Sequence, residues 1–337
     1  MTTRCQSRMR LPSGPRTTEA STRRAWLIAA GGAAAALAAG AGRAAAQTAP
    51  IPITVALAPT VDATAFYYAQ RSGALERAGL AATMKVVATG NLGVIAVVGG
   101  DANIGFANCL SLAQAHLRGV PLRLIAGAGL YDTNAPIARI FVANDSSIKS
   151  AKDLEEHTVA VSGLHDLLSL SVRAWLAQQG VDSTKVRFTE MPPPTMLAAL
   201  QTKRVDAIST FEPFSSDIVA SGQARTLAYP YDAIAKQFDV TAWFAHESWL
   251  GTHRDAAQRF SQVIRASAEY ADAHLSDMVP VVAAGTGMPV EVVTKALKAK
   301  VAPTVIPGQL QPLIDVAAKL GELSSAFPAR DMIWNGQ

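Results

Sequence analysis

The chain has 337 residues, of which 50% are hydrophobic, 6% aromatic and 17% charged. It is long enough for two domains, and its charged fraction lies below the roughly 25% that is usual for soluble proteins. Residues 1–46 hold seven arginines and one acidic residue, so the rest of the chain carries 23 basic and 25 acidic side chains, a net charge of −2. This balance offers no basic surface, and we expect no nucleic-acid partner.

The N-terminal segment has the composition of an export signal. Residues 21–46 begin with Ser-Thr-Arg-Arg, continue as an Ala/Gly-rich run and end in three alanines, the kind of small residue that precedes a cleavage site. The stretch 22–27 resembles a twin-arginine signal, with Trp26 where phenylalanine is usual. A membrane anchor is the alternative, but alanine and glycine give weak membrane affinity. We therefore predict a signal peptide over 1–46 and a soluble periplasmic product.

The two cysteines argue against a disulfide framework. Cys5 would leave with the signal peptide, and Cys109 would then be the only cysteine of the exported chain. We expect no internal disulfide, even in an oxidising compartment.

Strands and helices are predicted to alternate along the first part of the exported chain. The apolar patterns predict strands over 51–57, 82–87, 101–106 and 122–126. Helices are expected between them, over 65–70, from 89–93 to Gly99–Gly100, and from 107–109 to Arg118. This order is typical of a parallel-type α/β sheet.

A second alternating series follows, and it is succeeded by a helical tail. We predict strands over 138–143, 158–161, 185–189 and 240–245, helices over 150–155 and 166–179, and tail helices over 255–273, 290–300 and 310–320. The strands 138–143 and 240–245 are interpreted as two crossings between lobes. Lobe 1 would then comprise 47–141 and 243–337, and lobe 2 would be the insertion 142–242.

The stretch 191–214, MPPPTMLAALQTKRVDAISTFEPF, is interpreted either as one wall of a ligand cleft or as an ordinary helix–strand pair of the core, and its pattern alone favours neither. Its pattern predicts a proline-stiffened loop, an amphipathic helix around Met196–Leu200, a buried strand over 205–210 and a turn with polar atoms at 211–214. Open α/β sheets bind their ligands beyond the ends of such strands.

Several short motifs in order resemble one protein family. They are Phe-Tyr-Tyr-Ala at 66–69, Gly-Asp-Ala-Asn-Ile-Gly-Phe at 100–106, Ser-Ile-Lys-Ser at 147–150, the prolines at 192–194, Val-Asp-Ala at 205–207 and Glu-Pro-Phe at 212–214. Together they span about 51–275 and are similar to the periplasmic substrate-binding proteins of ABC importers, of the nitrate/sulfonate/taurine and thiamine-pyrimidine-precursor type. The resemblance implies an α/β, two-lobe periplasmic-binding-protein-like (type II) fold with two hinge crossings. It also implies a small-molecule ligand, a membrane permease as a transient partner, and a monomer.

The resemblance also implies where a ligand would bind. In such a cleft, loops at strand ends and helix N-termini present backbone N–H groups to polar parts of the ligand. The candidate ligand-binding residues are Pro59, Asp62, Asn91, Leu92, Asn108 and Cys109 in the first lobe, and Ser162, His165, Asp166, Thr210 and Glu212 in the second. For Asn91 and Asn108, helix capping alone is an equal alternative.

The charges of these candidates bear on the kind of ligand. Asp166 and Glu212 would repel sulfonate or nitrate at short range unless a cation compensates them. His165 could be that cation or a neutral donor, or simply an exposed loop histidine. Arg139 could reach an anionic ligand or form a salt bridge between lobes. We favour a heterocyclic or aromatic organic solute, and a sulfonate-like solute remains an alternative.

The sequence contains no pattern typical of an enzyme active site. The motifs His-x-x-x-His, Gly-x-Ser-x-Gly and the phosphate-binding loop are missing from it. We therefore predict no catalytic residues, no metal and no cofactor. One alternative is a lyase on the same fold, similar to chorismate dehydratase, although such enzymes are cytoplasmic and an export signal argues against them. A sensory ligand-binding domain is a weaker alternative.

Overall fold

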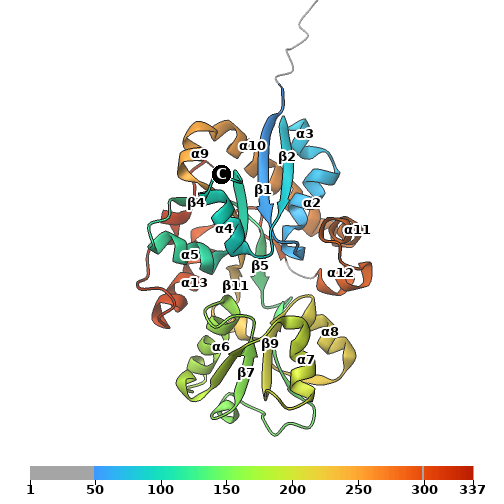
Figure 1. Ribbon diagram of the computed structural model, residues 1–337, viewed down its shortest axis with the longest axis vertical. Coiled ribbons are helices and arrows are strands. Elements are labelled where there is room, and N and C mark those ends of the chain that lie inside the picture. Colours follow the sequence, from blue (N-terminus) through green and yellow to red (C-terminus); the bar gives the residue numbers. More distant parts are fainter. Residues whose placement is uncertain (1–48, 298–299, 337) are drawn as a thin grey trace, which may run out of the picture. The chain divides into compact units, whose positions relative to one another are not determined.

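In the computed structural model, which describes residues 49–297 and 300–336, the strands form two five-stranded sheets and one three-stranded sheet (Figure 1). The predicted signal peptide and its cleavage site lie outside the described residues. Within the described part of the chain, no helix has both the length and the apolar character needed to cross a membrane.

The first sheet has the strand order β2-β1-β3-β12-β4. Its strands are β1 (Ile51–Leu57), β2 (Leu80–Val86), β3 (Ile104–Asn108), β4 (Leu122–Gly127) and β12 (Thr241–His246). β1 pairs in parallel with β2 and β3, whereas β12 is antiparallel to β3 and β4. We call this sheet and its helices the first lobe.

The second sheet repeats this plan with the order β10-β6-β9-β7-β8. Its strands are β6 (Ala138–Ala143), β7 (Thr158–Val161), β8 (Arg187–Glu190), β9 (Ala207–Phe211) and β10 (Ala224–Ala228). β7 is parallel to β8 and β9, and β6 is antiparallel to β9 and β10. This sheet with its helices is the second lobe, so the predicted two-lobe α/β fold is confirmed.

The third sheet lies where the chain passes between the lobes. It consists of β5 (Gly129–Asp132), β11 (Gln237–Asp239) and β13 (Lys300–Val301), in the order β11-β5-β13. β5 leads from the first lobe into β6, and β11 leads back into β12. The strands predicted as crossings, 138–143 and 240–245, instead pair within the lobe sheets, and each is the first strand after a crossing. The predicted lobe boundaries stay a prediction.

Helices pack on both faces of the first sheet. They are α2 (Thr64–Arg71), α3 (Ala74–Arg77), α4 (Gly90–Val98), α5 (Cys109–Leu117), α9 (Glu247–Thr252), α10 (Arg254–Ala273), α11 (Leu275–Thr286), α12 (Val290–Ala296) and α13 (Pro307–Lys319). On one face, fully buried Trp243 packs with its ring centre 4.8 Å from Phe106, 5.4 Å from Phe66 and 5.7 Å from Phe260. These rings join β3 and β12 to α2 and α10.

The second lobe has a smaller core on each face of its sheet. One core is formed with α6 (Leu167–Gln178), and the other with α7 (Pro193–Gln201) and α8 (Phe214–Ser221) (Figure 1). Strand residues alternate between the two faces, so Ile140 and Ala207 pack on the α6 side, and Phe141 and Ile208 on the α7 side.

The crossings themselves are packed with aromatic side chains. The rings of Tyr131, Tyr231 and Phe238 lie 5.3–5.5 Å apart between centres. They belong to one apolar cluster that continues to α5 and α13 of the first lobe and to Leu167 and Leu170 of α6. Hydrophobic packing therefore runs unbroken through the crossings.

Most predicted elements occur, and the exceptions have local causes. Glu212 and Pro213 form the turn expected at 211–214, and the unpredicted helix α8 begins at Phe214, where the Glu212 side chain accepts hydrogen bonds from Ser215 and Ser216 of its first turn. The predicted helix over 290–300 ends as α12 at Ala296, and Lys300 belongs to β13. The elements that were not predicted are β5, β10, β11, β13, α3, α8, α9 and α11.

Gly105 offers a direct test of the first-lobe core. It lies on β3, and a Cβ atom there would stand 2.3 Å from the Phe244 ring of β12. We predict that Gly105→Ala lowers the free energy of unfolding by about 1–3 kcal/mol in urea denaturation, because the buried ring would have to move. Gly251→Ala is the matched control, since a Cβ at Gly251 meets nothing within 4 Å. Equal effects of the two substitutions would contradict the packing.

Candidate functional site

A small cavity of about 70 Å³ lies where both lobes and both crossings meet. The described residues that line it come from the loop after β1, the end of β9 and the crossings: Thr60, Val61, Asp62, Ile137, Phe211, Glu212, Tyr231 and Val240. The loops after β1 and β9 follow the carboxyl ends of parallel strands, where open α/β sheets bind ligands. Each lobe contributes one carboxylate, Asp62 and Glu212.

Asp62 lies at the end of a short chain of contacts from the crossings, of which the last is long. The Gly129 amide donates to the Thr241 hydroxyl (2.7 Å), and that hydroxyl lies 3.5 Å from Asp62 Oδ2, where it can donate. Gly129 must lack a side chain, because a Cβ would stand 2.7 Å from the Thr241 hydroxyl and 2.9 Å from the Asp62 carboxylate. The first residues of β5 and β12 thus position the carboxylate.

Asp62 makes its surroundings electrostatically negative. Burial raises the pKa of the Asp62 carboxyl to about 6, and the hydrogen bond from Thr241 opposes part of this increase. Burial also raises the pKa of Tyr67 to about 12, with a further increase from the Asp62 charge. The pKa of Tyr231 is raised by burial and by the charges of Asp166 and Asp62, so its hydroxyl stays protonated and available to donate.

Glu212 joins the cavity to α8. Its side chain is buried and accepts hydrogen bonds from the hydroxyls of Ser215 (2.7 Å) and Ser216 (2.8 Å) and from the Ser216 amide (3.2 Å). A carboxylate near a helix N-terminus is favoured by the helix dipole. The neighbouring Phe211 ring is 37% exposed, which leaves an aromatic surface beside the carboxylate.

Two sets of polar contacts join the lobes on either side of the cavity. On one side, Lys295 of α12 pairs with Asp217 of α8 (3.3 Å), and the Ser216 hydroxyl donates to the Lys295 carbonyl (3.2 Å). On the other side, Arg173 of α6 pairs with Glu322, whose side chain is only 4% exposed. The two lobes are therefore in contact through polar side chains on both sides of the cavity.

Several predicted site residues act as helix caps. Asn108 Oδ1 accepts from the Ser111 amide (2.8 Å) at the start of α5, and Asp166 Oδ1 accepts from the Ser169 amide (2.8 Å) at the start of α6. Thr89, rather than Asn91, caps α4. The capping alternative for Asn108 therefore has a structural basis, and ligand contact by Asn91 and Asn108 stays a prediction.

The remaining candidates do not line the cavity. Ser162 donates to Asp166, Cys109 is buried, and Leu92 is 43% exposed on α4. His165 is 81% exposed and its Nδ1 lies 3.3 Å from Glu322. Pro59 precedes the lining residue Thr60, and Thr210 is fully buried beside Phe211.

Arg139 forms no salt bridge with the described residues of either lobe. Its Nε and Nη1 atoms are buried and have no hydrogen-bond partner among those residues, and its guanidinium lies 5.8 Å from the centre of the Tyr229 ring. Thr210, the residue opposite it on β9, has a buried hydroxyl with no hydrogen-bond partner in the same described set.

Six of the described lining residues were not among the candidate ligand-binding residues: Thr60, Val61, Ile137, Phe211, Tyr231 and Val240. Ile137, Tyr231 and Val240 come from segments around the crossings, and Val61 carries no polar group. The aromatic-proline run Tyr229-Pro230-Tyr231 was the available signal, because it interrupts the end of the second series with bulky side chains.

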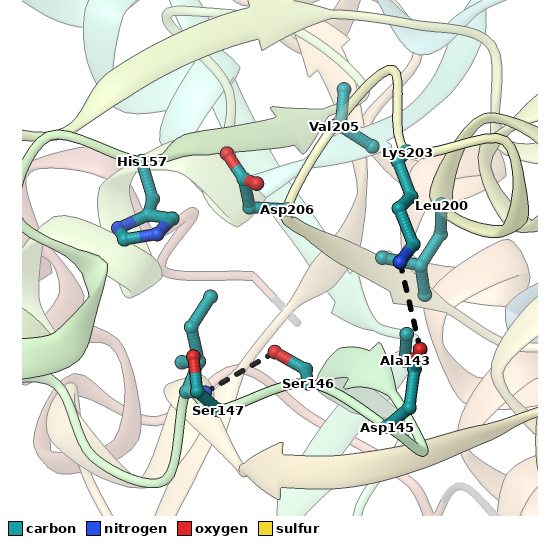
Figure 2. A pocket seen from close by; sticks show the side chains of 10 residues that line it. Ala143, Asp145, Ser146, Ser147, His157, Leu200, Lys203, Val205 and Asp206 are labelled. Atoms are coloured by element: carbon teal, nitrogen blue, oxygen red, sulfur yellow. Dashed lines mark hydrogen bonds and ion pairs between the residues drawn. The ribbon is translucent and has the colours of Figure 1, made fainter.

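A larger hollow of about 250 Å³ lies elsewhere on the second lobe, lined by residues including Asp145, His157, Lys203 and Asp206 (Figure 2). Its polar groups contact other parts of the second lobe: Lys203 forms a surface pair with Asp145 (3.6 Å), and Asp206 accepts from the Thr158 amide (2.8 Å). His157 and Asp206 immediately precede β7 and β9, so the hollow lies at the amino ends of those strands. We therefore place the candidate site at the smaller cavity.

Asp239, next to the lining residue Val240, gives a pH test of this region. It is fully buried, neither carboxylate oxygen has a hydrogen-bond partner among the described residues, and burial raises its pKa to about 7, only partly opposed by the nearby Ile306 amide. An acid whose pKa is higher in the folded state loses stability as the pH rises from its unfolded pKa to its folded pKa. We predict that stability falls between about pH 4 and pH 7, by roughly 1.4 kcal/mol per pKa unit at most.

Urea unfolding at a series of pH values measures this effect. Asp239→Asn should flatten the fall and stabilise the protein at pH 8 relative to wild type. Asp153→Asn is the control, because Asp153 is a solvent-exposed carboxylate whose pKa is lowered by hydrogen bonds from Lys149 and Ser150. An unchanged pH profile in Asp239→Asn would contradict the assignment.

Comparisons with known proteins agree with this architecture. The structure is similar to the periplasmic aliphatic sulphonate binding protein SsuA from Escherichia coli, with 18% identity, a TM-score of 0.71, and coverage of 85% of this chain and 93% of that one. It is also similar to the alkanesulfonate-binding protein SsuA from Xanthomonas axonopodis pv. citri bound to MOPS, with 18% identity, a TM-score of 0.67, and coverage of 85% of this chain and 99% of that one. A third similar structure is the periplasmic nitrate-binding protein NrtA from Synechocystis PCC 6803, with 13% identity, a TM-score of 0.68, and coverage of 85% of this chain and 86% of that one.

At these identities the solved structures establish the fold, which is the two-lobe fold of periplasmic binding proteins. No match was found among curated proteins. A family model described as "NMT1/THI5 like" matches residues 60–276, a span that includes both Asp62 and Glu212. The chain therefore belongs to the NMT1/THI5-like family.

Proposed function

We propose that this protein is the extracytoplasmic solute-binding component of an ABC importer. It would capture a small organic solute, heterocyclic, aromatic or sulfonate-like, between its lobes and deliver it to a membrane permease. The observation that carries the proposal is the cavity lined from both lobes and both crossings. Family membership supports it, as do the sulfonate- and nitrate-binding proteins among the structural neighbours.

The mechanism follows from the position of the cavity. A solute that contacts Asp62 of the first lobe and Phe211 and Glu212 of the second makes its full set of contacts only when the lobes touch. Differential affinity for that form shifts the equilibrium between open and closed lobes. The closed form would then be the one that docks transiently on the permease. Periplasmic location, export by the twin-arginine route and a monomeric state are parts of the same proposal.

Ligand capture can be tested without knowing the solute. The protein is expressed with its own leader, purified from the periplasm under non-denaturing conditions and examined by native mass spectrometry. We expect a small organic molecule bound at one equivalent, whose removal lowers the thermal unfolding temperature and whose return restores it. Chemical turnover of that molecule by the purified protein would instead support a lyase on the same fold.

The contact between Arg173 and Glu322 tests the closure mechanism. Arg173→Ala should shift the solute-free protein toward the open form and weaken solute binding about twofold to tenfold, because closure would bury the Glu322 carboxylate without its partner. Small-angle X-ray scattering measures the first effect as a larger radius of gyration. Arg187→Ala is the matched control, since Arg187 and Glu156 pair on the surface of the second lobe. A closed conformation unaffected by Arg173→Ala would contradict this mechanism.

A further inference from the structure

We propose that the cavity selects a small organic cation of the amidinium or guanidinium class, which binds to the Asp62 carboxylate. This inference rests on the proposed solute-binding function, and within it favours a cationic organic solute over a sulfonate-like one. It differs from the sulfonate and nitrate named for the structural neighbours, because it follows from side chains of this chain's own cavity.

The first argument is the charge of the lining. Of the described residues that line the cavity, two are carboxylates and none is lysine or arginine. Arg139 of β6 is not among them, since its guanidinium lies over Tyr229. An anion entering this cavity would face Asp62 at close range in a poorly screened environment. A cation would be attracted by the same charge.

The second argument is that the Asp62 carboxylate receives little hydrogen bonding from the described residues. Among the described residues, its side chain has one hydrogen-bond partner, the Thr241 hydroxyl at 3.5 Å, which is long for an O–H···O hydrogen bond. An ionised carboxylate that is partly buried with so little hydrogen bonding is costly. The carboxylate nevertheless borders the cavity, so a ligand can supply the missing donors.

The third argument concerns the shape of the ligand. A planar amidinium presents two parallel N–H groups and can donate both to one carboxylate. The rings of Phe211 and Tyr231 also line the cavity, and aromatic faces attract cations. The nearby Tyr67 and Tyr231 hydroxyls stay protonated, so they add no competing negative charge.

Charge also makes closure depend on the ligand. Closing the lobes brings the Asp62 carboxylate of one lobe and the Glu212 carboxylate of the other to the same cavity. A cation bound at Asp62 offsets the negative potential of both groups and favours the closed form. A bound sulfonate would oppose closure instead.

The test uses three molecules of nearly the same shape and different charge: acetamidinium, acetamide and acetate. Calorimetry with the mature protein at pH 7.5 and ligand up to about 20 mM measures the dissociation constants, since ligands of this size bind weakly. We expect acetamidinium to bind at least tenfold more tightly than acetamide or acetate. Acetate binding as tightly as acetamidinium, or no binding of acetamidinium, would overturn the inference.

Two variants connect the preference to Asp62. Asp62→Asn should weaken acetamidinium binding at least tenfold, while Asp255→Asn should leave it unchanged, because Asp255 pairs with Arg259 on the surface of α10. An unaltered affinity in Asp62→Asn would also overturn the inference.

If Asp62→Asn does not fold, the wild-type protein provides the same information. Protons compete with the cation for Asp62, so acetamidinium affinity should fall as the pH is lowered through about 6. Tyr67, Tyr231 and Glu212 also border Asp62 or its cavity, and the two tyrosines remain neutral over this range. A pH-independent affinity between pH 5 and pH 8 would count against Asp62.

The failure of this inference can be distinguished from failure of the proposed function. An anionic or neutral solute found bound to the periplasmic protein would leave solute binding intact and refute cation selection. Absence of any bound solute, together with no binding of the three probes, would refute both.

Discussion

The short hydrogen-bond chain from the Gly129 amide through Thr241 to Asp62 joins the features on which the rest of the structure depends. Gly129 begins the outgoing crossing, and Thr241 follows the returning one. The crossings are also bonded directly, because the Val240 amide donates to the Gly129 carbonyl (2.9 Å). The residues at which the crossings are bonded to each other therefore also contact the Asp62 carboxylate of the cavity.

This arrangement explains why the protein can couple solute capture to a change in shape. The sheet of each lobe has one antiparallel strand, β12 in the first lobe and β6 in the second, and each is the first strand after a crossing. The loops that follow the parallel strands β1 and β9 meet at the cavity. The aromatic cluster of Tyr131, Tyr231 and Phe238 stiffens the crossings. The exposed Lys295–Asp217 pair can break and reform at modest cost, whereas the Arg173–Glu322 pair, whose carboxylate is buried, favours the conformation in which the lobes touch.

The sequence predicted the alternating sheets well because each strand carries a local signal in its apolar residues. Asp62 and Glu212, which the family resemblance implied as ligand-binding residues, both line the cavity, and their contact with a ligand stays a prediction. The sequence did not reveal α8, because Glu-Pro after a strand is typical of a turn, and only the folded structure brings Ser215 and Ser216 onto the Glu212 side chain.

Other parts of the site depend on tertiary structure. Tyr231 and Val240 reach the cavity because the crossings carry them there, and no spacing in the sequence records that proximity. Whether Asn91 and Asn108 cap helices or face a ligand was equally open, because a side-chain oxygen can serve either purpose; in the structure Asn108 caps α5. His165 was considered as a partner for a ligand, yet in the structure its nearest acid is Glu322, more than 150 residues away in the sequence.

The central claim is that a solute is held between Asp62 of the first lobe and Glu212 of the second. A crystal structure of the protein with the solute that co-purifies from the periplasm tests it most directly. The account predicts electron density for that solute in the cavity, in contact with Asp62 and with Phe211 or Glu212. Density elsewhere, such as in the hollow beside His157 and Lys203, would contradict it.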